Sequence, residues 1–430
     1  MTDILLSNAR LIDPETGHDG PGALLIRDGQ IADVAKGAAP AAPDGAAVID
    51  CGGMPLAPGI VDMRVSVGEP GERHKESYRS AGLAAAAGGV TTIAVQPDTD
   101  PPVDDPAVLE FAMRRAERAS VVRVAPMAAL TRGLKGREMA EYGFLLDAGA
   151  LAFTDGSHAV KDPTVFRNCL DYAHSLGALV VHHPQDPAMA AEGSATESHF
   201  ASHLGLPAIH PVAERMMLAR DLALVEVTGG RYHADLVTTR GALATLRRAK
   251  ESGLPVSAGI SHHHFILNEF DLADYATFFK LDPPLREEDD RAAMEAAVAE
   301  GLIDVICSSH RPQDEESKRQ PFEVAAAGAV GLETLLPGAL KLWHDGLVSL
   351  PTLFERLSLT PARLLGLPAG RLAKGAPADL VLFDPNAPYV LDRFALRSKS
   401  KNTPFDRRLM TGRALRTFVA GREVFTHGVA

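Results

Sequence analysis

Short apolar runs alternate with segments of helical character between residues 57 and 371, and this alternation constrains the fold more than any other feature. The runs lie at 60–65, 90–95, 121–125, 150–153, 178–181, 222–237, 254–258 and 303–306. About eight strand–helix units in about 300 residues are what a (β/α)8 TIM barrel requires. A doubly wound open sheet could give the same alternation, so periodicity alone leaves that fold open.

Helix boundary signals support the helical segments between the runs. Asp105 precedes Pro106 at the start of one segment, a pairing of N-cap and first-turn residue that favours a helix over 105–113. Another helix is predicted over 288–300, where Gly301 stands at the C-cap position.

The two ends of the chain share a different, strand-rich pattern. Asp28-Gly29 lies between the apolar runs 23–26 and 31–34, which is a strong hairpin signal. A strand at 378–383 and a second glycine-turn hairpin at 416–425 follow near the other end. These patterns predict a small β-sandwich domain built from residues 1–56 and 372–430, around a barrel formed by residues 57–371.

The composition of the chain argues against some classes of binding partner. The 430 residues carry a net charge of -12, which argues against nucleic acid or an anionic membrane as a partner. The first residues lack the pattern of a signal peptide, and no apolar stretch approaches the ~20 residues of a membrane span, so we expect a cytoplasmic protein. Cys51, Cys169 and Cys307 are scattered, so neither a disulfide framework nor a thiolate zinc site is indicated.

In a barrel of this kind, the chemistry sits where strands end, so the residues just after each run are the candidates. They are Arg64, Ser66, Asp98, Asp155, His182, His183, His233, Leu236, His262, His263, His264, Asp282, Ser309 and His310.

Motifs along nearly the whole chain resemble those of dihydroorotases in the amidohydrolase superfamily. They include PGIVDMRVSVGEPGERHKE at 58–76, LAFTDG at 151–156, VVHHPQDP at 180–187, VEVTGGRYHADLVTT at 225–239, FKLDPPLREEDDRAAM at 279–294 and DVICSSHRP at 304–312. The resemblance implies a (β/α)8 barrel with a β-sandwich from both termini. It also implies a zinc-dependent, reversible ring closure of carbamoyl aspartate to dihydroorotate, in which the metal activates water and an aspartate moves the proton.

The metal positions of this family are mostly changed here. The family has a His-x-His pair after the first strand, an acidic ligand after the fourth, one His after each of the fifth and sixth, and an Asp after the eighth. The matching residues in this chain are Arg64 and Ser66, Asp155, His183, Leu236 and Ser309. Only Asp155 and His183 keep the family's residue type, whereas a catalytic zinc site usually has three protein ligands.

Three substrate positions differ as well. Gly68 stands where the family has an arginine, and Asp98 and Asp282 stand where it has asparagines. Two carboxylates therefore replace neutral groups, and the main cation is lost, at a place where a dianionic substrate would bind.

The remaining histidines offer one route to a metal site. Consecutive strand residues point to opposite faces, so at most two of His262, His263 and His264 could aim at one centre. The family has histidines there and at positions 233 and 310, so we interpret all of these as packing or hydrogen-bonding residues. Arg64 brings a positive charge that repels a metal ion, and we expect it to pair with Asp155, with Asp98 as a second candidate partner.

These residues predict a dihydroorotase-like protein that lacks catalysis and holds no cofactor. Inactive chains of this kind associate with the catalytic chain of aspartate transcarbamoylase, so the resemblance implies a structural partnership with that chain in an oligomer of pyrimidine biosynthesis. Two alternatives stay open. One is an active zinc-dependent dihydroorotase or related cyclic-amide hydrolase, and the other is a metabolite-binding protein without chemistry.

Overall fold

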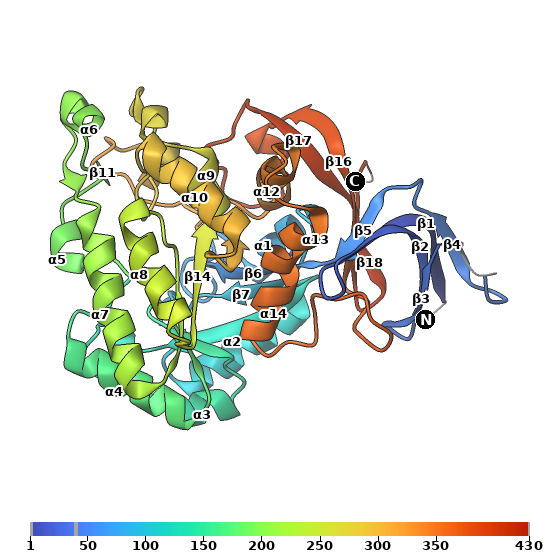
Figure 1. Ribbon diagram of the computed structural model, residues 1–430, viewed down its shortest axis with the longest axis horizontal. Coiled ribbons are helices and arrows are strands. Elements are labelled where there is room, and N and C mark those ends of the chain that lie inside the picture. Colours follow the sequence, from blue (N-terminus) through green and yellow to red (C-terminus); the bar gives the residue numbers. More distant parts are fainter. Residues whose placement is uncertain (1–2, 38–41, 429–430) are drawn as a thin grey trace.

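A computed structural model describes residues 3–37 and 42–428 of the chain, and in this part eight parallel strands form the barrel (Figure 1). Their order is β15-β14-β13-β10-β9-β8-β7-β6. The strands are β6 (Ile60–Val65), β7 (Val90–Val95), β8 (Arg123–Ala129), β9 (Ala152–Thr154), β10 (Leu179–His182), β13 (Arg231–Ala234), β14 (Val256–Ser261) and β15 (Val305–Cys307).

His310 closes the ring of strands. The Ser66 amide donates to the His310 carbonyl at 2.8 Å, and the His310 amide donates to the Arg64 carbonyl at 3.2 Å. The first and last barrel strands are thereby joined, which an open sheet does not do. The predicted (β/α)8 fold is confirmed, and the doubly wound alternative is excluded.

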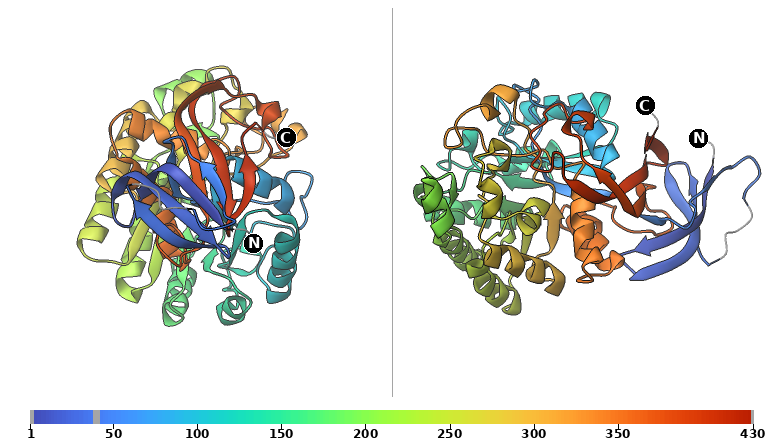
Figure 2. Two further views of the ribbon diagram at one scale, coloured as in Figure 1. Left: turned by 90° about the vertical axis from the view of Figure 1, so that its right-hand side faces the viewer. Right: turned by 90° about the horizontal axis from the view of Figure 1, so that it is seen from above.

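Helices follow the barrel strands in the chain and surround the barrel (Figure 2). They are α1 (Tyr78–Ala87), α2 (Pro106–Ala119), α3 (Tyr142–Asp147), α4 (Pro163–Ser175), α7 (Val212–Thr228), α8 (Arg240–Glu251), α10 (Glu288–Glu300) and α12 (Leu335–His344). The predicted boundaries at Asp105 and Gly301 are confirmed: the Asp105 side chain accepts from the Ala107 amide, and Gly301 ends α10 with φ 84°.

The apolar run at 222–237 was wrongly predicted to be a strand along its length. Its first part belongs to α7, and only Arg231–Ala234 forms strand β13. Leu218, Leu222 and Val225 are buried along one face of α7, and their spacing of three to four residues is that of a helix. Gly229 then ends the helix in the left-handed conformation, at φ 68°.

Strands from both ends of the chain combine in a second sheet (Figure 2). Its members are β1 (Ile4–Asp13), β2 (His18–Arg27), β3 (Gln30–Lys36), β4 (Ala47–Asp50), β5 (Pro55–Pro58), β16 (Leu380–Val390), β17 (Leu409–Val419) and β18 (Arg422–Thr426). Both predicted hairpins form, with Asp28-Gly29 joining β2 to β3 and Ala420-Gly421 joining β17 to β18. The domain boundaries at 56/57 and 371/372 stay a prediction.

The second sheet is fixed to the barrel by polar contacts. Arg123 at the start of β8 pairs with Asp379, with Nε 2.6 Å from Oδ2. The Thr417 hydroxyl on β17 donates to the carbonyl of Ala86 in α1 at 2.7 Å.

Short elements fill the connections. They are α5 (Pro187–Ala190), α6 (His199–Leu204), α9 (His262–Ile266), α11 (Glu315–Lys318), α13 (Leu350–Phe354), α14 (Thr360–Leu364), β11 (Ala195–Thr196), β12 (Ala208–Ile209), the 3₁₀ turns η1 (Arg132–Leu134), η2 (Glu269–Leu272), η3 (Thr277–Phe279) and η5 (Arg393–Ala395), and the π turn η4 (Glu355–Leu359). Among the residues that the structure describes, no helix is both long and apolar enough to cross a membrane.

Candidate functional site

Arg64 lies near the carboxyl end of strand β6 and forms an ion pair with Asp235. The two side chains are only 7% and 4% exposed. A second donor of the guanidinium, Nη2, bonds to the Ser157 hydroxyl at 3.0 Å. Arg64 thus crosses the barrel mouth from the first strand to the residue after β13.

The expected pair between Arg64 and Asp155 is wrong. Asp155 accepts a hydrogen bond from the Thr131 amide at 2.8 Å and another from the Thr131 hydroxyl. These donors satisfy the carboxylate, and Asp235 takes the cation. Burial raises the pKa of Asp155, since no cation is paired with it in the described part of the chain.

His183 follows strand β10 and is 2% exposed. Neither of its ring nitrogens has a hydrogen-bond partner among the described residues, and its Nε2 lies 3.8 Å from the Asp282 carboxylate. Burial lowers the pKa of His183 to about 3, so the ring is neutral at physiological pH.

Leu236 and Ser309 share an uncommon backbone conformation. Their φ angles are 63° and 48°, in the left-handed region that is unfavourable for side chains such as these. Leu236 is fully buried and brings only carbon atoms to the place where the resemblance predicts a histidine ligand. The surrounding structure therefore holds both positions in a conformation that is unfavourable for these residues.

The altered substrate positions lie around the same mouth. A Cβ atom on Gly68 would come within 2.3 Å of the Glu72 carbonyl oxygen, so this loop leaves no room for any side chain there. Asp98 accepts from the Ser66 hydroxyl at 2.9 Å. Asp282 accepts from Gln185 Nε2 at 3.2 Å and lies 3.7 Å from Arg311.

The other histidines make separate contacts. His262, His263 and His264 begin helix α9, so the expectation that they continue a strand is wrong; Ser261 caps this helix by accepting from the His263 amide. The contacts of the six side chains are His182–Asp221, His233–Ser257, His262–Thr334, His263–Ser261, His264–Pro283 and His310–Glu76.

These residues do not fit the zinc site that the resemblance implies. Within residues 3–37 and 42–428, no group of three His, Cys, Asp or Glu side chains is arranged to hold a metal ion. The Arg64 cation stands where the resemblance places a ligand, and Asp155 already accepts from Thr131. Both geometry and charge oppose a metal at this place.

Asp235, Ser157, Gln185 and Arg311 were missed as site residues in the sequence. Asp235 directly precedes Leu236, and an acidic residue beside a lost ligand position was the available signal for the partner of Arg64. Ser157 accepts from Arg64 and Arg311, both at 3.0 Å, a bridge for which the sequence holds no signal.

The mouth retains two adjoining cavities of about 400 and 330 Å³, which share Leu134 and His158 in their walls. His183, Gln185 and Asp282 line the larger cavity, whereas Ser66, Asp98 and Arg311 line the smaller one.

Known proteins match both the sequence and the fold. Residues 53–242 match the family model described as Dihydro-orotase-like. The dihydroorotase of Anaeromyxobacter dehalogenans (strain 2CP-C) is 40% identical over 433 residues, which cover 100% of each chain. The chain belongs to the dihydroorotase family. The dihydroorotase of Pelobacter propionicus is also 40% identical, over 98% of this chain and 99% of its own.

Solved structures share the fold of this dihydroorotase family member. The L-hydantoinase (dihydropyrimidinase) from Arthrobacter aurescens matches with a TM-score of 0.90 at 24% identity, over 100% of this chain and 97% of its own. D-hydantoinase from Thermus sp. matches with a TM-score of 0.83 at 21% identity, over 99% and 96% of the two chains.

Proposed function

We propose that this chain is a non-catalytic member of the dihydroorotase family that serves pyrimidine biosynthesis as a structural partner of the aspartate transcarbamoylase catalytic chain. One observation supports the non-catalytic part of the proposal. Arg64 and Asp235 form a buried ion pair near the carboxyl ends of the barrel strands, at a position where the resemblance places a metal ligand.

Substrate capture would also be impaired at this mouth. The Gly68 loop excludes an arginine side chain, and Asp98 and Asp282 add negative charge. A dianionic substrate would meet both carboxylates, although Arg311 beside Asp282 offsets part of that charge. Binding of carbamoyl aspartate should therefore be weak whether or not a metal ion is bound.

The partner half of the proposal rests on the family resemblance and predicts an interface on the barrel exterior or rim, away from Arg64. A stable interface of this kind buries at least ~1,200 Å² in total. Coexpression with the transcarbamoylase of the same organism, followed by sedimentation, should give one species heavier than either chain. Each chain should also raise the melting temperature of the other, because each binds the folded form.

The matched control is the same transcarbamoylase mixed with an unrelated protein of similar mass. Two separate boundaries at micromolar concentration, together with full transcarbamoylase activity in the absence of this chain, would contradict the partnership.

A second candidate, a metabolite-binding role without chemistry, is favoured by unsatisfied polar atoms in the larger cavity. Both nitrogens of His183 and the Gln185 Oε1 atom are buried without partners in the described part of the chain. Unpaired buried polar groups are costly, and a ligand could satisfy them. A thermal-shift screen with metabolites tests this role: a stabilising compound whose effect Gln185→Leu removes would support it, and no stabilising compound would count against it.

Family membership keeps the active alternative, a zinc-dependent cyclic-amide hydrolase, open to experiment. Turnover of dihydroorotate or carbamoyl aspartate that a chelator abolishes would establish it and overturn the non-catalytic proposal.

A further inference from the structure

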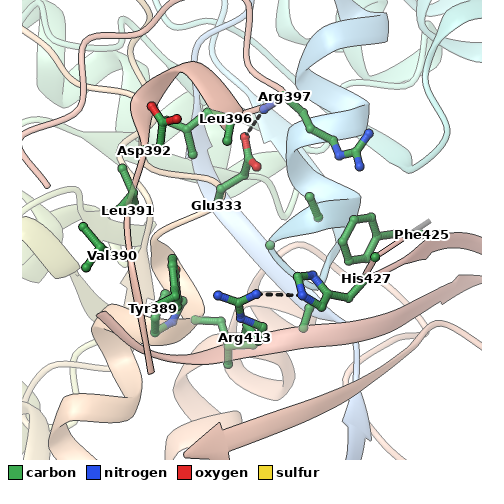
Figure 3. A pocket seen from close by; sticks show the side chains of 17 residues that line it. Glu333, Tyr389, Val390, Leu391, Asp392, Leu396, Arg397, Arg413, Phe425 and His427 are labelled. Atoms are coloured by element: carbon green, nitrogen blue, oxygen red, sulfur yellow. Dashed lines mark hydrogen bonds between the residues drawn. The ribbon is translucent and has the colours of Figure 1, made fainter. Parts of the chain in front are cut away.

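A cavity of about 490 Å³ lies between the barrel and the terminal sheet (Figure 3). Its walls come from the end of α1, the start of α12, strands β16, β17 and β18, and the segment around η5. It shares no lining residue with the cavities at the barrel mouth, so its function is independent of Arg64 and of the proposed function above. The volume is in the range of small-molecule sites.

Most of the wall is apolar. Leu336 and Pro337 of α12 lie on one side, and Leu391 and Leu396 lie on the segment that leads into and out of η5. Such a surface favours a ligand with an apolar body, because burying apolar area is the main source of affinity in sites of this kind.

Arg413, on strand β17, carries donors that the described residues leave unused. Its guanidinium stacks over the Tyr389 ring at 4.2 Å, and Nη1 donates to Nε2 of His427 at 2.7 Å (Figure 3). Its Nε is buried without a hydrogen-bond partner, and no carboxylate pairs with it in the described part of the chain. A buried, unpaired guanidinium donor is costly unless an acceptor from outside meets it.

Arg397 adds a second cation on the opposite side. Its guanidinium lies 5.4 Å from the centre of the Phe425 ring and has no carboxylate partner among the described residues. Its position over an aromatic ring, like that of Arg413, holds the charge in place without neutralising it.

Two carboxyl groups also line this cavity, and among the described residues neither forms an ion pair with Arg413 or Arg397. Glu333 accepts from the backbone amides of Arg397, at 2.6 Å, and Ser398, at 3.3 Å. Burial raises the pKa of Glu333 to about 7, so this group is partly neutral near physiological pH. Asp392 is exposed and caps η5 by accepting from the Phe394 amide at 2.9 Å.

We propose that this cavity binds a small amphipathic organic acid, whose carboxylate accepts from Arg413 and whose apolar body lies against Leu336, Leu391 and Leu396. Arg397 supports the negative charge from the rim.

Calorimetric titration of the full chain with three probes tests the chemical class. 3-Phenylpropionate carries both the anion and the apolar body, 3-phenylpropylamine reverses the charge, and acetate lacks the apolar body. Phenylpropionate should bind at one site per chain, and the other two should bind roughly tenfold or more weakly. Equal or tighter binding of the amine, or no binding of phenylpropionate at millimolar concentration, would overturn the proposal.

Two variants locate the site. Arg413→Gln should weaken phenylpropionate binding roughly tenfold or more, because it removes a charge-assisted hydrogen bond. Arg311→Gln, the matched loss of an arginine at the barrel mouth, should leave the affinity unchanged. The opposite pattern would place the ligand at the mouth and contradict the proposal.

Ala395→Trp provides a test that keeps every charge. Ala395 is exposed on η5 and lines the cavity, so an indole there should fill the space without disturbing the core. Binding should be lost while the circular dichroism spectrum is retained. Unchanged binding by this folded variant would count against the cavity as the site.

Discussion

Arg64 and Asp235 join the first and sixth barrel strands through a buried ion pair, in the place where the family resemblance puts a metal. The pair places a guanidinium and its compensating carboxylate at the barrel mouth. The Ser157 hydroxyl accepts from both Arg64 and Arg311, so it links this pair to a second arginine.

Loss of the Arg64 charge should destabilise the protein strongly. Arg64→Ala leaves the Asp235 carboxylate buried and unpaired, which typically costs ~3–5 kcal/mol in free energy of unfolding. Arg247→Ala is the surface control, because its pair with Glu300 is exposed at 49% and 51%, and its cost should stay below ~1 kcal/mol. Urea denaturation measures both, and similar losses for the two variants would contradict the prediction.

The double variant Arg64→Leu/Asp235→Leu separates the pair from its surroundings. If the two charges stabilise each other, the double variant should lose less free energy of unfolding than Arg64→Leu and Asp235→Leu lose together when each is measured separately. Additive losses would mean that Arg64 is stabilised mainly by other groups, such as Ser157.

Metal content should be well below one zinc ion per chain after expression in zinc-supplemented medium. The reason is that Asp155 and His183 alone fall short of a ligand set and Arg64 repels a cation. The fourfold variant Arg64→His/Ser66→His/Leu236→His/Ser309→Asp restores the family's residue types and serves as the positive control. Stoichiometric zinc in the unmodified protein, measured by atomic emission after dialysis, would refute the prediction.

Neither the unmodified protein nor Arg64→His/Ser66→His should interconvert carbamoyl aspartate and dihydroorotate. The double variant still lacks ligand atoms at Leu236, the proton-transferring aspartate at Ser309 and the substrate cation at Gly68. Absorbance assays in both directions, with a chelator-treated sample as the baseline, check this outcome. Turnover above that baseline in the unmodified protein would show that another arrangement supports catalysis.

Stability should fall as pH drops, and His262 should contribute measurably. Burial lowers the pKa of His262 to about 3, from an ordinary value near 6.5. Between those values the unfolded chain binds the proton and the folded chain does not, so the free energy of unfolding decreases as pH falls from about 6.5 towards 3. From pH 7.5 to 5 this single group should account for about 2 kcal/mol.

His262→Gln should therefore lose about 2 kcal/mol less than the unmodified protein over that pH interval, as measured by urea denaturation. Thr334→Val is the matched control, because it removes the partner of the same 2.9 Å hydrogen bond without removing a titratable group. It should keep the pH dependence of the unmodified protein. A pH dependence of His262→Gln equal to that of Thr334→Val would argue against a buried neutral imidazole.

Local sequence patterns were enough to predict the barrel, two helix boundaries and a hairpin. The Asp105 cap, the Gly301 helix end and the Asp28-Gly29 hairpin each depend on residues next to one another in the chain, and all three formed as predicted. The segment 222–225 failed because a short apolar run suits either a buried strand or a helix face, and its packing against the barrel decided between them.

Sequence by itself determined which groups stand at the barrel mouth, including Arg64, Asp155, His183 and Leu236. Tertiary structure alone decided how they pair. Asp155 is 24 residues from Thr131 and is satisfied by it, which leaves Arg64 to Asp235, 171 residues away in the chain (235 − 64). Partner choice depends on distances set by closure of the barrel through His310, and the cavity around Arg413 depends on how the terminal sheet docks on α1 and α12. No local pattern encodes these contacts, because they join segments that meet only in the folded chain.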